Sequence, residues 1–327
     1  MKQNNIKLKY EVQNCEFRKN EFQILYHYFE EIDTKDTFTT TELDELNINQ
    51  VHNMYRQKHR IPFPDEIKSI REQYGLSATK MSKLLGFGSN QYRKYEDDEM
   101  PSVSNGKMIE ALKDPLFFKE LFEQSKNEFS ENEIIRIEKK IDELIKSRTD
   151  KQTLWYSFIF KDHFPYRSRA NGFASINPEK IRQLIIFFSS SLKGVFETKL
   201  NKLLFYSDFL SYKSSGRGIT GLQYKAITFG PVPLNYGTIY ENLKGLKKDV
   251  VDIGNGHFGS MIFSEESFDS SIFTEKEINI IKTVLNRFKG TKAGEMSEIS
   301  HTENAWIENK DNYEIIDYNY AFSLSQI

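Results

Sequence analysis

The sequence predicts a mainly helical protein of the α+β class, with more than one domain. Its 327 residues are 38% hydrophobic and 14% aromatic, which is enough apolar side chain to form packed cores. Apolar residues mostly recur three or four positions apart, as on one face of a helix, and only short stretches alternate as in a strand. We therefore expect a small α/β segment at the N-terminus, a unit of five short helices, and a mostly helical C-terminal domain with a small sheet.

The composition excludes several classes of protein. The net charge is −2, which excludes binding to nucleic acid by bulk positive charge, so any DNA contact must be local. Cys15 is the single cysteine, which excludes an intramolecular disulfide and a multi-cysteine metal site. No apolar run is long enough to span a membrane, and the first residues lack the pattern of a signal peptide. We expect a cytoplasmic protein with no metal, no other cofactor and no membrane partner.

Cap and turn residues divide the chain into four predicted parts. These parts span residues 1–59, 60–126, 127–176 and 177–327. In the first part, an apolar run at residues 22–29 predicts a strand. Thr39 or Thr40 is expected to cap a helix that continues to Tyr55. A segment this short buries little surface alone, so we expect it to pack on its neighbours.

The second part is predicted to hold five short helices. Pro64 starts the first, because its fixed φ suits the first helical position, and Gly75 ends it. The fourth is expected at residues 103–112 and the fifth from Pro115. A compact unit of this length and helix order is typical of repressors.

The second and third of these helices lie between residues 77 and 95, with a glycine turn at Gly86. Ser77 and Ser89 are the expected N-caps, since a serine hydroxyl accepts an unpaired amide of the first turn. Tyr92 and Tyr95 are expected to face inward. The outer face of the third helix then carries Ser89, Asn90, Gln91, Arg93 and Lys94.

These five outer residues are the predicted DNA contacts. Asn and Gln bind adenine edges bidentately and Arg binds guanine, so a short helix with these side chains suits a major groove. An αα-hairpin with a polar surface in an ordinary helical bundle is the alternative. The acidic run at residues 96–99, just beyond the outer face, accompanies the predicted contacts.

Five short motifs run through this part in order. They are Pro-x-Glu-Ile-x-x-Ile-Arg from Pro64, Leu-Ser-Ala from Leu76, Leu-Leu-Gly-Phe-Gly from Leu84, Gln-Tyr-x-x-Tyr-Glu from Gln91 and Met-Pro-Ser from Met100. Together they resemble the Xre/Cro-type helix-turn-helix of MqsA-like antitoxins, except that Asp98 stands where many such domains have glycine. The resemblance implies binding to operator DNA as a homodimer across a palindrome.

Residues 38–47 are similar to the segment that joins this domain to a zinc module in the same family. The family's module carries two Cys-x-x-Cys pairs, whereas only Cys15 is present here. His27, His52 and His59 do not have the spacing of ligands. We interpret the N-terminal part as a degenerate, metal-free version of this module.

The third part begins with a capping box at residues 130–133. The stripe that follows, Ile134, Ile137, Ile141, Leu144 and Ile145, predicts one long amphipathic helix. It is interpreted as ordinary core packing, with a connector or dimer element as the alternative.

The fourth part is predicted to be helical around a short strand and a hairpin. Helices are expected after Asn177, at residues 199–212, from Asn235 to about Leu246, after Thr274, and from Thr291 or Ser297 to Trp306. The middle of residues 218–233 alternates and predicts a short strand, and residues 250–263 predict one or two short strands with a turn at 254–256. Gly230-Pro-Val-Pro233 is interpreted as a rigid turn beside a groove.

Several motifs of this part occur in a characteristic order. They are Lys-Leu-x-Lys-Leu-Leu-Phe-Tyr-Ser-Asp from Lys199, Ile-Thr-Gly from Ile219, Tyr224, Gly-Pro-Val-Pro from Gly230, and Ser-His from Ser300 followed by Trp306. This part resembles the Panacea domain of SocA-like antitoxins, which implies neutralisation of a cognate toxin protein by direct binding. The candidate toxin contacts are Lys199, Lys202, Tyr206, Asp208 and Tyr224, with Lys199 and Lys202 on a polar side of their helix. Internal scaffolding is the favoured alternative for the aromatic members.

No catalytic constellation is recognised, so we expect a protein that is not an enzyme. His301, close to Trp306, is the most tempting general base, yet no nucleophile or carboxylate partner can be assigned to it. The sequence therefore predicts the antitoxin of a type II toxin–antitoxin system. The alternative is a mobile-element or prophage transcription regulator, or a proteolytic adaptor, without a toxin partner.

Overall fold

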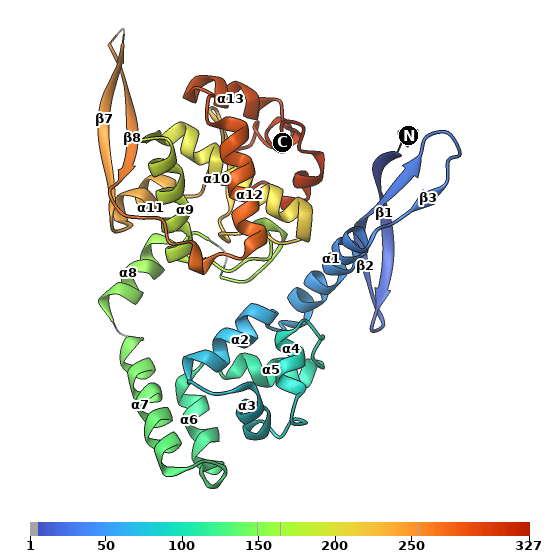
Figure 1. The fold of residues 1–327 in the computed structure, drawn as a ribbon, viewed down its shortest axis with the longest axis vertical. Helices are drawn as coiled ribbons and strands as arrows, with labels where there is room; N and C mark the ends of the chain where they lie inside the picture. Colours follow the sequence, from blue (N-terminus) through green and yellow to red (C-terminus); the bar gives the residue numbers. More distant parts are fainter. Residues whose placement is uncertain (1–5, 149, 164, 255) are drawn as a thin grey trace. The chain divides into compact units, whose positions relative to one another are not determined.

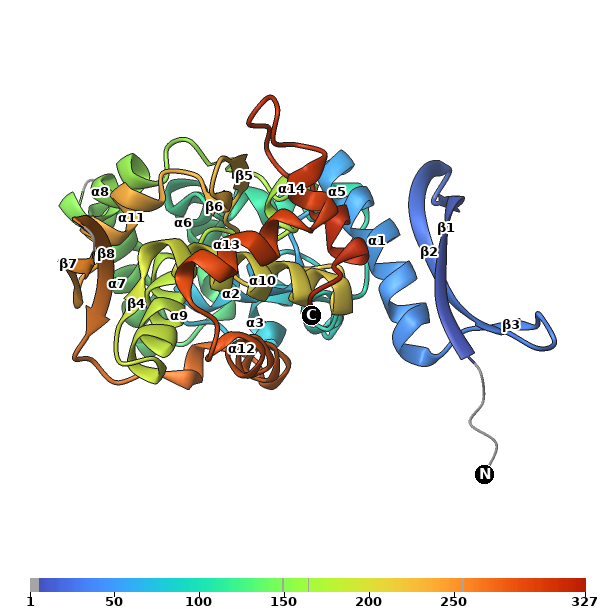
Figure 2. The ribbon, with the colours of Figure 1, turned by 90° about the horizontal axis from the view of Figure 1, so that it is seen from above.

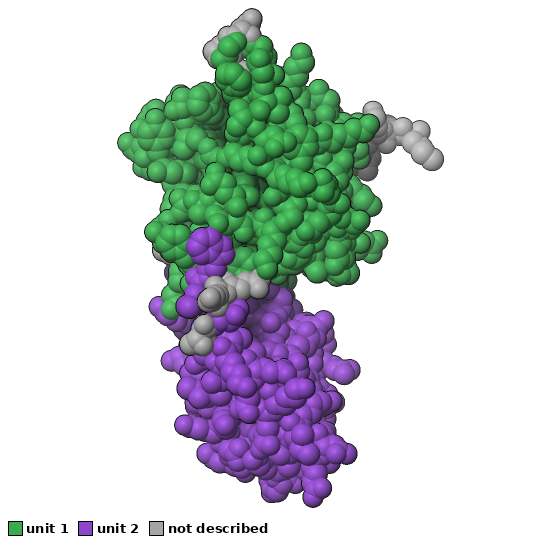
Figure 3. All heavy atoms as spheres, turned by 90° about the vertical axis from the view of Figure 1, so that its left-hand side faces the viewer, with its two compact units in different colours: residues 1–11, 25–50, 156–327 green, residues 12–24, 51–155 purple. Residues whose placement is uncertain are grey.

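The computed structural model describes residues 6–148, 150–163, 165–254 and 256–327. The protein is mainly helical with small antiparallel sheets, which confirms the predicted fold class (Figure 1). The chain divides into two compact units (Figure 3). Unit 1 comprises residues 1–11, 25–50 and 156–327, and unit 2 comprises residues 12–24 and 51–155. The division into four parts at the predicted boundaries stays a prediction.

The N-terminal segment is a β-meander followed by a helix, and its residues contribute to both units. Its elements are β1 (Ile6–Phe17), β2 (Asn20–Glu31), β3 (Thr37–Phe38) and α1 (Thr41–His59), with the strand order β1-β2-β3. The predicted strand is part of β2, and Thr40 Oγ1 accepts a hydrogen bond from Leu43 N at 3.4 Å, as an N-cap does. The sequence analysis missed β1. Arg18 and Lys19, both at positive φ, form the tight turn that pairs it with β2.

The helices of unit 2 surround one apolar core. They are α2 (Pro64–Gln73), α3 (Ala78–Leu84), α4 (Gln91–Glu96), α5 (Val103–Ala111), α6 (Pro115–Gln124) and α7 (Glu131–Ser147), with a short 3-10 turn at Lys126–Glu128. Ile137 and Ile141 of α7 are buried in that core, and the rest of the predicted stripe packs against it. This confirms the core-packing interpretation of the stripe.

The C-terminal elements of unit 1 are arranged around one long helix, α10. The elements are α8 (Lys151–Ile159), whose first residues belong to unit 2, α9 (Pro178–Ser191), β4 (Val195–Phe196), α10 (Glu197–Ser215), β5 (Tyr224–Ile227), β6 (Gly230–Pro233), α11 (Tyr236–Asn242), β7 (Leu246–Gly254), β8 (His257–Ser264), α12 (Glu275–Phe288), α13 (Ala293–His301) and α14 (Asn304–Ile307). Further 3-10 turns lie at Arg169–Asn171, Ser270–Ile272 and Tyr318–Ser323. α10 contacts α9, α12, α13 and β6, so it is covered on nearly all sides (Figure 2).

Three details of this region differ from the sequence-based expectation. Residues Gly230–Pro233 are strand β6 and pair with β5, so the interpretation of this motif as a turn is wrong. Asn235 precedes α11 in the left-handed region at φ 52° and makes no capping hydrogen bond with its side chain. The expected helix ends at Asn242 because Gly245, at φ 76°, turns the chain into β7. The predicted turn at 254–256 includes Asn255, which lies outside the described residues.

Candidate functional site

The predicted DNA-binding hairpin of unit 2 is formed by α3 and α4. Ser77 Oγ accepts from Lys80 N at 3.2 Å and caps α3, and Gly86 follows at φ 66°, both as predicted. Tyr92 N donates to Ser82 Oγ at 2.9 Å, which fixes the first turn of α4 against α3. Tyr92 and Tyr95 are buried, and burial raises the pKa of Tyr92 far above its usual value. One side of α4 is therefore anchored to the core.

The opposite side of α4 carries the predicted DNA contacts. Ser89, Asn90, Arg93 and Lys94 are exposed and Gln91 is half-buried. The expectation that Ser89 caps this helix is wrong, because α4 starts two residues later and Asn90 occupies the N-cap position without a side-chain hydrogen bond. The five side chains nevertheless lie together at the start of α4, and their contact with DNA stays a prediction.

The acidic run beyond α4 interacts with the same helix. Glu99 accepts a hydrogen bond from Gln91 Nε2 at 2.7 Å and lies 3.9 Å from Lys94 Nζ. Glu96 instead pairs with Arg71 on α2, with 2.5 Å between Oε1 and Nε. Asp98 adopts φ 78°, a backbone conformation that favours glycine. Glu99 thus holds two of the predicted contacts in the free protein.

In unit 1, α10 buries polar side chains that the sequence placed on an exposed face. Lys199 and Lys202 are 7% and 0% exposed, so the predicted polar side of this helix is wrong. Lys199 Nζ donates to the backbone oxygens of Thr291 at 2.6 Å and Lys289 at 3.3 Å, just beyond the C-terminal end of α12. Lys202 Nζ has no hydrogen-bond partner among the described residues, and burial lowers the pKa of Lys202 to about 7.

Asp208, also on α10, is the centre of a buried hydrogen-bond network. Its Oδ1 accepts from Ile219 N at 2.7 Å and Thr220 N at 2.8 Å, and its Oδ2 accepts from Thr220 Oγ1 at 2.5 Å and Tyr224 OH at 2.6 Å. Burial raises the pKa of Asp208, and these hydrogen bonds oppose the rise. The network fixes the chain that leads into β5. It supplies four donors to one buried carboxylate, as such a group requires.

A second buried carboxylate, Glu303, lies between α13 and α14. Tyr206 OH donates to its Oε1 at 3.2 Å, and Ser325 N donates to its Oε2 at 2.9 Å. Gln326 N adds a hydrogen bond at 3.2 Å. No carboxylate partner was assigned to His301 from the sequence, and Glu303, two residues further on, is bonded to Tyr206 and to the C-terminal residues.

All five predicted toxin contacts in unit 1 are therefore interior residues. Lys199, Lys202, Tyr206, Asp208 and Tyr224 are each less than 9% exposed, which favours the scaffold interpretation. His301 stacks on Trp306 with ring centroids 3.9 Å apart, and burial lowers the pKa of this histidine. Trp306 Nε1 in turn donates to Ile227 O at 2.7 Å, so this pair supports β5.

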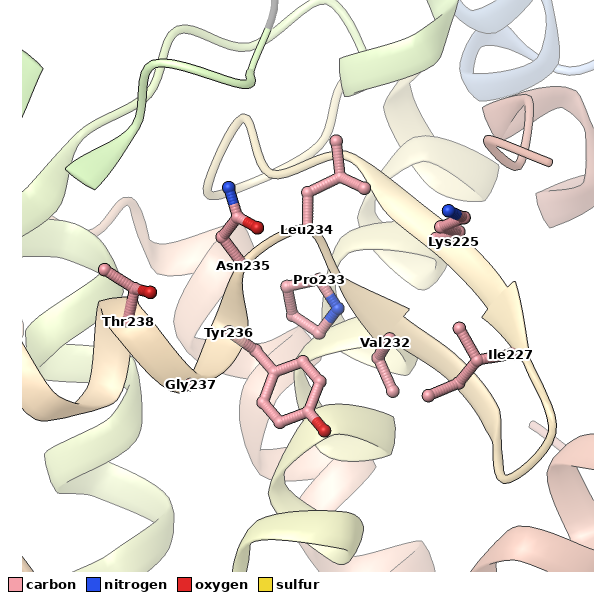
Figure 4. Close-up of a pocket in the computed structure, with 9 residues that line it drawn as sticks. All are labelled: Lys225, Ile227, Val232, Pro233, Leu234, Asn235, Tyr236, Gly237 and Thr238. Carbon is pink, nitrogen blue, oxygen red and sulfur yellow. The ribbon is translucent and has the colours of Figure 1, made fainter. Parts of the chain in front are cut away.

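A surface pocket of about 360 Å³ lies on the β5–β6 hairpin and the start of α11 (Figure 4). It is lined by Lys225, Ile227, Val232, Pro233, Leu234, Asn235, Tyr236, Gly237 and Thr238. A groove beside Gly230–Pro233 was expected from the sequence, but Tyr224 was the one residue of this hairpin predicted to contact the toxin. The alternation of Lys225 and Ile227 with the buried Tyr224 and Ala226 was the available signal for an exposed face.

Metal and membrane binding were also assessed from the geometry. The part of the chain that the structure describes brings no three His, Cys, Asp or Glu residues together as a metal ion would require. None of the helices described combines the length and hydropathy needed to cross a bilayer.

Comparison with known proteins adds one finding. A search of the curated proteins and a search of the solved structures each found no match. Residues 200–307 match the family model "Antitoxin SocA-like, Panacea domain". This segment contains most of α10, the β5–β6 hairpin and the pocket, as well as β7, β8, α12 and α13. The chain therefore contains a SocA-like Panacea antitoxin domain at residues 200–307, which indicates a role related to toxin–antitoxin systems and implies a toxin partner.

Proposed function

We propose that this protein is the antitoxin of a type II toxin–antitoxin system. The observation that carries the proposal is the Panacea antitoxin domain at residues 200–307. In this proposal the C-terminal region binds a cognate toxin protein directly in the cytoplasm and blocks its activity. The antitoxin neutralises by binding and makes or breaks no covalent bond.

We further propose that α3 and α4 form a helix-turn-helix that represses the operon shared with the toxin. The exposed polar side chains at the start of α4, on a helix anchored by two buried tyrosines, support this proposal. Two copies of the chain would bind the two half-sites of a palindromic operator. A zinc-free N-terminal module belongs to the same proposal.

The test is co-expression with the product of the adjacent gene. If that product arrests growth, the antitoxin should restore it, and the two proteins should co-purify as a complex. An Arg93→Ala variant of the full chain separates the two activities, because neutralisation should survive and binding to the operon's promoter should weaken. Growth arrest that persists in the presence of the full chain would contradict neutralisation.

The alternative is a transcription regulator or proteolytic adaptor without a toxin partner, for which the same α3–α4 surface would suffice. It predicts tight binding to a promoter together with an adjacent gene whose product does not slow growth. The co-expression experiment distinguishes the two functions.

A further inference from the structure

We propose that the toxin docks on the pocket of the β5–β6 hairpin, by inserting an apolar side chain that lies beside an acidic residue of the toxin. This inference rests on the proposed antitoxin function and specifies its binding surface. We define the hairpin face as Lys225, Ile227, Val232 and Tyr236, all of which line the pocket.

The hairpin face is apolar at its centre. In the register of the two strands Lys225 pairs with Val232 and Ile227 pairs with Gly230, so the side chains of Lys225, Ile227 and Val232 share one side of the sheet. The opposite side carries the buried Tyr224 and Ala226. The pocket volume of about 360 Å³ is within the range of ~300–1,000 Å³ typical of ligand pockets. An apolar side chain of a partner protein fits this description of an anchor site.

Lys225 supplies the charge that selects the partner's chemistry. Its ammonium group makes no hydrogen bond or ion pair with another described residue, although its side chain is half-buried at the pocket. Lys248, by contrast, pairs with Glu197 at 3.1 Å. An unpaired cation that lines the pocket is complementary to a carboxylate beside the inserted side chain.

The outer edge of β6 excludes docking by addition of a strand. Leu234 N donates to Gln223 O at 2.9 Å, so Val232, two residues before it, also faces β5 with its backbone. Pro231 and Pro233 therefore face away from β5, where their rings stand in place of N–H donors. Docking on this hairpin therefore uses side chains inserted into the pocket.

Hydrogen bonds and close contacts fix the buried side of the hairpin, which favours binding without rearrangement. Tyr224 OH donates to the buried Asp208, and Trp306 Nε1 donates to Ile227 O at 2.7 Å. An added Cβ at Gly230 would lie 2.3 Å from Ser300 Oγ, so this strand is in close contact with α13. A preorganised pocket loses little conformational freedom on binding, which raises affinity.

The experiment measures binding of the full-length chain to the purified product of the adjacent gene by calorimetry. We expect Lys225→Glu and Ile227→Asp each to weaken binding by about tenfold or more and to weaken protection of growing cells. Lys225→Arg should retain the affinity. The matched controls are Lys282→Glu on α12 and Val250→Asp on β7, both at exposed positions outside the pocket, and these should bind as the unchanged chain does. Thermal unfolding of each variant verifies that it is folded.

The outcomes separate this inference from the function on which it rests. If the unchanged chain binds and protects, and the Lys225 and Ile227 variants do so equally well, the pocket is not the docking site. If Val250→Asp weakens binding instead, the toxin docks on the β7–β8 ribbon and this inference is wrong. If the unchanged chain neither binds the adjacent product nor protects against it, the antitoxin function itself is refuted.

Discussion

Replacement of Lys202 by methionine should stabilise unit 1, although lysine is the native residue. The side chain is 0% exposed and its ammonium group has no hydrogen-bond partner among the described residues. An ionised amine in such a site is strongly unfavourable, so the pKa falls to about 7 from its ordinary 10.5. Methionine has a similar length and needs no polar partner.

The magnitude follows from the difference between the pKa values of the folded and unfolded chains. Between pH 7 and pH 10.5 the unfolded chain binds a proton at Lys202 that the folded chain does not, so stability rises with pH in this window. A difference of one pH unit between pKa and pH corresponds to about 1.4 kcal/mol, so lysine at this position destabilises the folded state by about 4 kcal/mol at pH 7 and about 2 kcal/mol at pH 9. The unchanged protein should therefore gain about 2 kcal/mol between these pH values.

The assay is urea unfolding at pH 7 and pH 9, followed by the fluorescence of Trp306. A Trp155→Phe background removes the second tryptophan, so the signal reports on unit 1. Lys202→Met should be more stable at pH 7 and should lose the gain between pH 7 and pH 9. Lys282→Met, at an exposed position on α12, is the matched control and should keep the gain.

Two results would refute this reasoning. If Lys202→Met and the unchanged protein had parallel stability profiles between pH 7 and pH 9, the amine would titrate at its ordinary pKa. If Lys202→Met were less stable at pH 7, the ammonium group would be making a favourable interaction in the folded protein.

Three further predictions concern Gly221, Glu303 and Arg93. In the same urea titration, Gly221→Ala should destabilise the protein by about 2–4 kcal/mol. The reason is that φ is 75° at this position and the new Cβ would lie 2.5 Å from Ser175 C. Gly294 has open space around it, so Gly294→Ala is the control and should be neutral or mildly stabilising. Glu303→Ala should lower the free energy of unfolding by about 3 kcal/mol, because four hydrogen bonds to this carboxylate are lost. It should also increase amide hydrogen exchange at residues 324–327, and unchanged exchange would contradict this role. Arg93→Ala should weaken binding to the operon's promoter by about 1–3 kcal/mol and relax base preference at one position, as measured by fluorescence anisotropy. If the variant keeps the affinity and base preference of the unchanged chain, α4 does not enter the major groove of DNA.

Local signals determined most of the helices. Ser77, Asn177 and Thr274 each accept the hydrogen bond of an N-cap, and Pro64 and Pro115 begin helices as predicted. These features depend on a few neighbouring residues, so they can be identified from the chain alone. Strand β1 was not predicted, although the alternation of Ile6, Leu8, Tyr10 and Val12 is the local signal of a strand.

The sequence by itself determined which segment is antitoxin-like and predicted which residues contact DNA. Only the tertiary structure decided which polar side chains are available. Lys199, Lys202 and Asp208 look like the surface of an ordinary helix, but α9, α12, α13 and β6 cover α10 and make them internal. Lys225 and Ile227 were not predicted as binding residues from the sequence, yet they line the pocket. The physical reason is that exposure is set by contacts between segments far apart in the chain, whereas caps, turns and helical periodicity are set by adjacent residues.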